Sequence, residues 1–279
     1  MKDTMNLGKI NPQEREFKKI EKKTDHIPSK IHPDTLFTFT TRLEYLLKYL
    51  KNRMISPRYC DEDIGYLKIM GMRSIAYPMK CFCDINMQKL DVHMAWYGDY
   101  GIAFYKSWGM ERNIQPVHYL NEKADLRNDI SKVFRAVLRE DVVGTKTHEM
   151  LKDYLLHELM YYKPYQGKIM NRKTGKVKKK CFADECEWRF IPDVSSLEFP
   201  QVIPEQSFRN SGLTELYSNS MELKKEVSLC FEYSDIKHII VQTVEEYKEL
   251  SLAIDSWEVD DKEEILSKVI VWQQKREDF

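Results

Sequence analysis

The chain has 279 residues, which is enough to bury a sizeable core in one large domain or in a domain with appendages. Lysine plus arginine and aspartate plus glutamate both total 44, so the formal net charge is zero and a surface that is basic throughout is excluded. No apolar run reaches the roughly 18 residues that span a bilayer, and the polar N-terminus has no secretory signal. We therefore expect a cytoplasmic protein with no membrane partner, whose six cysteines stay reduced.

The chain begins with a polar arm, residues 1–30, and continues as a single α+β domain over residues 31–279. The arm either docks on a partner or is a frayed tail. Residues 36–41 are typical of a strand, and residues 42–52 of an amphipathic helix with a leucine face. Thr41 and Glu44 have the spacing of a capping box at the start of this helix. Residues 56–71 are acidic and irregular, which indicates a loop and then a short helix.

Residues 77–119 concentrate cysteine, histidine, tryptophan, tyrosine and glycine, while lysine and glutamate are sparse. Here a Tyr77-Pro78 turn leads to the end of a buried strand at Cys81–Cys83. A helical segment over residues 86–95 places His93 and Tyr97 on the same side. Glycines at 98 and 101 then bracket a turn before a strand at 102–105, with at least one glycine at positive φ, and another strand begins at Pro116.

The second half mixes helices and strands without regular alternation. Residues 121–140 and 148–162 form two helices of a helical insertion, the second with Leu151, Tyr154 and Leu159 facing inward. Strands are expected at 182–191, 229–233 and 236–241, and helices at 213–217, 244–253 and 262–272. This pattern predicts an α+β fold: a mixed, mainly antiparallel sheet with flanking helices and the helical insertion.

Residues 167–180 carry seven basic side chains and a Thr-Gly turn, which predicts a basic hairpin. The stretch from Lys168 to Lys180 either contacts nucleic-acid phosphates or protects a solvated sheet edge. The cysteines at 81, 83, 181 and 186 lack zinc-knuckle spacing, so buried thiols are expected and no metal site. The motifs of P-loop, G-x-S-x-G, H-E-x-x-H and G-x-G-x-x-G enzymes do not occur.

Several of these segments together resemble the AbiGi family of bacterial abortive-infection, phage-resistance proteins. The most specific segment is CFCDI…HMAWYGDYGIAFYKSWG…IQPVHYL. The segments LFTFTTRLEYLLKYLKN, ECEWRFIP and YSDIKHIIVQTVEEYKEL also fit, and the resemblance covers roughly residues 33–250. It implies phage defence, and it implies a partner: a toxin, or another protein of the same defence operon.

The segment Glu185-Cys186-Glu187-Trp188-Arg189 offers the best candidate chemistry. On a strand its two glutamates and arginine share one side, opposite a core-facing side, and such a row is either a solvated face or a site. Paired carboxylates can raise one pKa and hold a sugar hydroxyl, as in ADP-ribosyltransferases, which bind NAD.

The opening segment also resembles that of DarT-like toxins, although Thr38 or Thr40 stands where those enzymes have histidine. Two hypotheses follow: an ADP-ribosyltransferase-like effector, or a non-enzymatic antitoxin or regulator whose polar cluster holds the fold. Clustering in an open cleft favours the effector, and burial in satisfied pairs favours the antitoxin. The effector uses Glu187, Glu185 and His93 as catalytic residues and Thr40, Tyr97, Tyr100 and Arg189 as ligand-binding residues.

Overall fold

In the computed structural model the described residues are 27–139, 144–171, 175–209, 212–257, 259–260 and 262–276. Most of the expected N-terminal arm lies outside them, and its last residues, from Ile27 to Lys30, are exposed. None of the helices in the described part of the chain is long and apolar enough to cross a bilayer.

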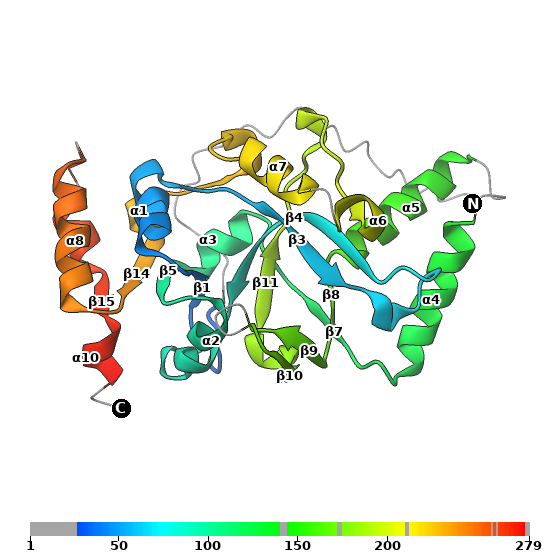
Figure 1. The fold of residues 1–279 in the computed structure, drawn as a ribbon, viewed down its shortest axis with the longest axis horizontal. Helices are drawn as coiled ribbons and strands as arrows, with labels where there is room; N and C mark the ends of the chain where they lie inside the picture. The colour runs from blue at the N-terminus through cyan, green and yellow to red at the C-terminus, as the bar shows by residue number, and fades with distance from the viewer. Residues whose placement is uncertain are drawn as a thin grey trace, which may run out of the picture.

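The described residues form an α+β fold around a mixed, mostly antiparallel nine-stranded sheet, as predicted (Figure 1). The order along the sheet is β15-β14-β5-β1-β4-β11-β6, and β3 and β12 also pair with β4. Only the β14–β15 pair among these is parallel. The strands in this order are β15 Val269–Val271, β14 Ile236–Val241, β5 Tyr100–Tyr105, β1 Thr35–Thr40, β4 Ser74–Cys83, β11 Glu187–Phe190 and β6 Gln115–Pro116, with β3 Arg58–Asp63 and β12 Ile203–Pro204.

Strand β4 connects the two parts of the sheet because different parts of it pair with different strands. Residues 74–79 pair with β3, and residues 80–83 pair with β11. The expected turn at Tyr77-Pro78 is wrong, since both residues lie inside β4. Pro78 is tolerated because it faces Tyr59, whose amide points away and donates to Ser218 Oγ at 2.9 Å, so no ladder bond needs a Pro78 donor.

One half of the sheet, β15-β14-β5-β1, packs on apolar side chains. Helices α1 (Leu43–Asn52), α3 (Lys106–Glu111) and α8 (Val244–Asp255) contribute to its largest core, and α2 (Leu90–Tyr97) packs against Phe37 and Cys83. Helix α1 matches the expectation, but its capping box is wrong: Arg42 is the N-cap and its side chain makes no capping bond. Figure 1 shows α8, α1 and β14 gathered on the left.

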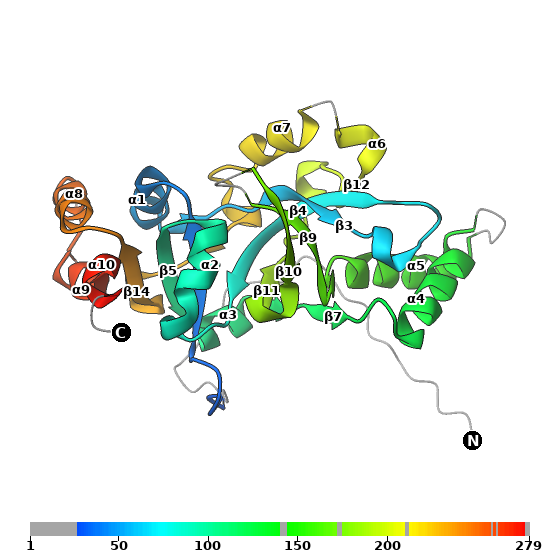
Figure 2. The same ribbon diagram turned by 60° about the horizontal axis from the view of Figure 1, so that its bottom comes forward.

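The other half carries the two expected helices, α4 (Asp125–Val137) and α5 (Lys146–Leu159). Phe134 and Leu159 pack with Tyr77 of β4, whereas Leu151 and Tyr154 are exposed, contrary to expectation. These helices lie in the chain between β7 (His118–Leu120) and β8 (Tyr162–Pro164), which form a parallel pair. The expected hairpin is β9 (Gln166–Met170) with β10 (Val177–Cys181), and Figure 2 shows it beside β11.

Two predictions from the local sequence pattern are wrong because these segments pair with strands that are distant in the sequence. Residues 58–63, expected as a loop, form β3, and the short helix after them is a 3-10 turn at Gly65–Leu67. The last expected helix is broken into α9 (Lys262–Ser267), β15 and α10 (Trp272–Arg276), because the β-branched run 269–271 pairs with β14. The remaining elements are β2 Met54–Ile55, β13 Leu229–Cys230, α6 Glu205–Phe208 and α7 Leu213–Ser220.

The predicted glycine turn of the central stretch is confirmed at Gly98 but not at Gly101. Gly98 ends α2 with φ of 142°, and β5 begins at Tyr100, so Gly101 lies in the strand rather than in the turn. A Cβ at Gly98 would lie 2.2 Å from the carbonyl oxygen of Thr40. The absent side chain therefore allows the end of α2 to pack on the end of β1.

Candidate functional site

Strand β11 carries the two central charged residues of the candidate site. Glu187 and Arg189 share one face, as expected, but this face is the buried one: their exposed fractions are 5% and 0%. Trp188 and Phe190, on the opposite face, are only partly buried. Glu185 is not on the strand; it ends a 3-10 turn at Phe182–Glu185 and is also buried. Strand alternation predicted which residues share a face but not which face is covered.

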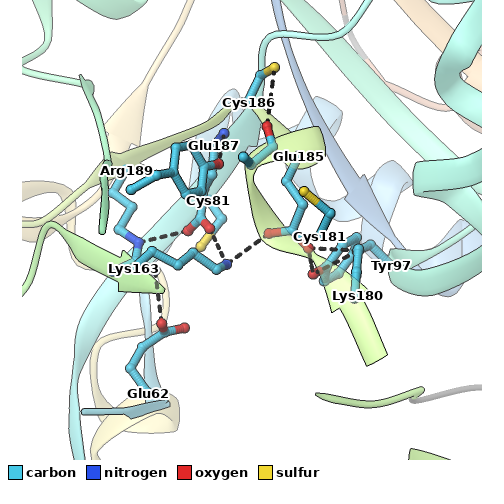
Figure 3. A network of polar contacts seen from close by, with 12 residues as sticks. Glu62, Cys81, Tyr97, Lys163, Lys180, Cys181, Glu185, Cys186, Glu187 and Arg189 are labelled. Atoms are coloured by element: carbon cyan, nitrogen blue, oxygen red, sulfur yellow. Dashed lines mark hydrogen bonds and ion pairs between the residues drawn. The ribbon is translucent and has the colours of Figure 1, made fainter. Parts of the chain in front are cut away.

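Arg189 is held by four groups, and Figure 3 shows part of this arrangement. Its Nε donates to Glu187 Oε1 at 2.6 Å, and its Nη2 donates to Glu62 Oε2 at 2.9 Å. Its Nη1 donates to the Tyr77 hydroxyl at 2.6 Å and to the Met160 carbonyl at 2.7 Å. Because a guanidinium has five fixed donors, these contacts set the side chain in one orientation.

Lys163 of β8 links the two glutamates. Its Nζ donates to Glu185 Oε2 at 2.8 Å and also to Glu187 Oε2. Since Glu187 Oε1 already accepts from Arg189, both oxygens of that carboxylate are occupied. Lys163 is buried, and its position directly after α5 and the turn that follows brings it to β11.

The outer end of the cluster involves α2 and the hairpin. Glu185 Oε1 accepts from the Tyr97 hydroxyl and lies 2.6 Å from Lys180 Nζ. That ammonium group also lies 4.7 Å and 4.5 Å from the ring centroids of Trp96 and Tyr97, within cation–π range. The hairpin is thus attached to the body of the protein through Lys180.

We call the six charged residues of this cluster the buried ion network: Glu62, Lys163, Lys180, Glu185, Glu187 and Arg189. Three cations face three carboxylates, so the network is electrically balanced. Burial alone would raise the pKa of Glu187, but Arg189 and Lys163 outweigh it and hold that pKa well below its usual range. Burial opposes the charge on Lys163 too, yet Glu187, Glu62 and Glu185 raise its pKa well above the ordinary value. Glu187 and Lys163 therefore stay ionised near neutral pH.

His93 lies beside the network without an ion-pair partner in the described part of the chain. Its ring centroid is 5.5 Å from that of Phe39 and 4.5 Å from that of Tyr97. Burial lowers its pKa to about 4, although Glu185 acts in the opposite direction. The imidazole is therefore neutral at physiological pH and packs as an aromatic ring. The expected i, i+4 placement of His93 and Tyr97 is confirmed.

The expected site is brought together only in part. His93, Tyr97, Glu185, Glu187 and Arg189 are contiguous, but two of the predicted ligand-binding residues, Thr40 and Tyr100, have their partners elsewhere. Tyr100 donates to Glu246 Oε1 at 2.5 Å, and Thr40 pairs with Tyr100 across β1 and β5.

Lys163, Lys180 and Glu62 were missed by the sequence analysis. Glu62 lay in a segment expected to be a loop, and a single lysine after a helix carries no motif. Among the described residues, no cluster of histidine, cysteine, aspartate and glutamate could hold a metal ion.

A family model described as "Putative abortive phage resistance protein AbiGi, antitoxin" matches residues 52–242. "Abortive phage resistance protein AbiGi" of Lactococcus lactis subsp. cremoris is 31% identical over 250 residues, covering 80% of this chain and 98% of that protein. The chain belongs to the AbiGi family. The resemblance found in the sequence is confirmed. No solved structure matches the chain.

This AbiGi-family chain also has a large groove, of about 2160 Å³, next to the buried ion network. Strands β1, β3 and β4, helix α1 and the β9–β10 hairpin all contribute to its lining. Lys163, Glu185 and Glu187 reach its wall, whereas Arg189 lies behind them and is fully buried. The groove is open, and these three network residues at its wall are already paired with one another or with other members of the network.

Proposed function

We propose that this AbiGi-family protein is an antitoxin that neutralises a toxin partner by binding it, without catalysing a reaction of its own. The description of the matching family model includes the word antitoxin, and the Lactococcus relative is named as a phage resistance protein. An abortive-infection antitoxin holds its toxin inactive until infection disturbs the pair.

The observation that carries the proposal is that every oxygen of the two carboxylates already has a partner within the protein. A general base or a group that holds a sugar hydroxyl needs a free oxygen facing the substrate. Both oxygens of Glu187 are occupied by Arg189 and Lys163, and both oxygens of Glu185 by Lys163, Tyr97 and Lys180. The lowered pKa of Glu187 also disfavours proton exchange near neutral pH.

The effector hypothesis receives less support. An ADP-ribosyltransferase-like pocket for NAD was expected to combine Thr40 and Tyr100 with the glutamates. Thr40 lines the same groove as both glutamates but is not among the described residues that pair with them, and Tyr100 is outside the groove lining and donates to Glu246. His93 is packed between aromatic rings and is neutral. A structural role for the polar cluster explains these contacts without a substrate.

Titration of neutralisation separates the two hypotheses. The chain and the product of its neighbouring gene, tested as the toxin, are expressed from separately controlled promoters in bacteria, and growth is followed. Binding without catalysis predicts protection only when the chain is at least equimolar with the toxin. Protection at far lower amounts would contradict the antitoxin proposal, as would toxicity of the chain expressed alone.

The Glu187→Gln variant sharpens this titration. Removing the charge leaves Arg189 and Lys163 with one carboxylate fewer, so we expect a lower melting temperature and a loss of protection that follows the loss of folded protein. A variant that melts like the wild type yet loses all protection would favour a catalytic carboxylate. His238→Gln, at a partly exposed site in the apolar half, is the control and should protect normally.

A further inference from the structure

The groove begins where two neighbouring strands separate. Strand β1 is antiparallel to β4, but their pairing is confined to Phe37 and Cys83. Beyond this point the pairs of β1, up to Thr40, are with β5 alone. Residues 38–41 line the groove instead, and on the other side β4 pairs with β3 from Met79 onward.

The separation leaves strand edges open. In the described part of the chain, β1 has no strand partner on its β4 side after Phe37, and because Thr38 Oγ1 still donates to the Cys81 carbonyl at 3.0 Å, its open edge begins at Phe39. Among the same described residues, strand β3 has no strand partner except β4, and on its outer edge the Tyr59 amide is already bound to Ser218 Oγ. Residues 58 and 60–63 of β3 line the same groove as residues 38–41 of β1. An open edge presents backbone donors and acceptors, and an extended peptide can satisfy them by adding a strand.

The charges that line the groove fall into two groups. Nine belong to the buried ion network or to the pairs Lys48–Glu222 and Arg209–Glu205. The other nine have no ion-pair partner among the described residues, and six of these are basic. The basic side chains are Arg58, Arg73, Lys80, Lys123, Lys168 and Lys179, and the acidic ones are Asp61, Asp63 and Glu122. The uncompensated charge of the lining is therefore positive, although the chain as a whole is neutral.

We infer that the groove binds an extended, acidic segment of the toxin partner, which adds as a strand to the open edge of β1 while its carboxylates face the basic lining. This inference rests on the antitoxin function proposed above. It assigns the hairpin a role: Lys180 fixes the hairpin to the protein body, and Lys168 and Lys179 present free charge to the groove. The basic hairpin is then a wall of a peptide site rather than a contact to nucleic acid.

Charge reversal on β3 and on β10 tests the electrostatic part of this inference. Arg58 of β3 and Lys179 of β10 are both exposed, and both line the groove. We expect Arg58→Glu/Lys179→Glu to weaken toxin binding by about tenfold or more, with a larger effect at low salt. The matched control is Lys51→Glu/Lys248→Glu, which changes the net charge equally at exposed positions outside the groove lining. Equal affinities of the two double variants would overturn the inference.

Hydrogen exchange tests the strand pairing. Binding of purified toxin to the full chain should slow exchange of backbone amides in residues 38–41, and it should leave 269–271 at the far edge of the sheet unchanged. No added protection at residues 38–41 in a saturated complex would exclude strand addition. A wild-type chain that neither binds nor neutralises the toxin overturns the antitoxin proposal itself. Binding and neutralisation with unchanged exchange overturn this inference alone.

A single-stranded RNA oligonucleotide serves as the competing probe, because the groove also has aromatic side chains that could stack bases. We expect the oligonucleotide to bind weakly and to leave the toxin complex intact in fluorescence anisotropy. Tight RNA binding that Arg58→Glu/Lys179→Glu abolishes, together with unchanged toxin binding, would assign the groove to nucleic acid and overturn the inference.

Discussion

On one side of the β1–β4 junction the sheet packs on an apolar core of leucine, isoleucine and aromatic residues, while on the other side its centre is the buried ion network. The apolar half gains stability from area removed from water, which depends little on the direction of any single contact. The charged half depends on directional contacts that compensate the desolvation of every member. Loss of one member therefore leaves another buried charge without its partner, whereas a truncated leucine leaves only a cavity.

The largest expected effect is at Arg189. Arg189→Leu removes one of the two cations that pair with Glu187, and it removes the cation that pairs with Glu62, so it should lower the free energy of unfolding by about 3–5 kcal/mol. Urea denaturation followed by circular dichroism measures it. The double variant Arg189→Leu/Glu187→Leu removes both charges of one pair, so it should cost less than the sum of the single variants. Additive losses, or a single-variant loss below about 1 kcal/mol, would contradict a coupled network.

In the apolar half, the matching change is Leu46→Ala at a fully buried position of α1. The lost transfer energy and the cavity together should cost about 2–4 kcal/mol in the same assay. Because no charge is exposed or left unpaired, this loss should be the same at low and high salt. A strong salt dependence of the Leu46→Ala loss would show that the two halves are not stabilised differently.

The pH dependence of stability should arise mostly in the charged half. The folded-state pKa of His93 is lowered to about 4, so its contribution is present above the unfolded value of about 6.5 and is lost as pH falls toward 4. The lowered pKa values of Glu185 and Glu187 add a second loss, below about pH 4.3. We expect the urea midpoint to fall between about pH 7 and 5.

Replacing His93 by glutamine should flatten this first part of the pH profile. His238, in β14, is the control because its pKa is also lowered, by burial and by Lys237 and Lys275, but it is only half-buried. His238→Gln should change the profile less. An unchanged profile in His93→Gln would contradict the assignment of the first loss to that ring.

The smallest effect is expected at Tyr100, which the sequence placed in the site and the structure places outside it. Tyr100→Phe removes the hydrogen bond to Glu246, a residue that also accepts from the Thr243 amide in the capping box of α8. The loss should be about 1 kcal/mol, with toxin neutralisation unchanged. A complete loss of neutralisation by a normally folded Tyr100→Phe protein would contradict this expectation and show that Tyr100 takes part in function.

The same two halves differ in how well they could be predicted. The strands around Phe37, Phe104 and Ile239 and the helices α1 and α8 follow regular apolar patterns, so their positions were predicted closely. The strand β3 was missed because its sequence, RYCDED, has the acidic composition of a loop and is stabilised by pairing with β4.

The sequence predicted several residues of the candidate site but not their burial or their partners. The spacing of Glu187 and Arg189 indicated a shared face, but the cover over this face is assembled from β3, β4, β8 and the hairpin, which are distant in sequence. Lys163, the residue that joins both glutamates, comes from a strand of three residues with no recognisable motif. Such long-range pairing between charged groups has no local signal.

The central position of β4 also has a consequence during synthesis. The edge of β4 that pairs with β11 is complete when Cys83 leaves the ribosome, but β11 follows only about one hundred residues later. At bacterial elongation rates of roughly 5–20 residues per second, this edge and its apolar neighbours wait for about 5–20 s. A newly made chain therefore passes through an interval in which it is open to chaperones and proteases.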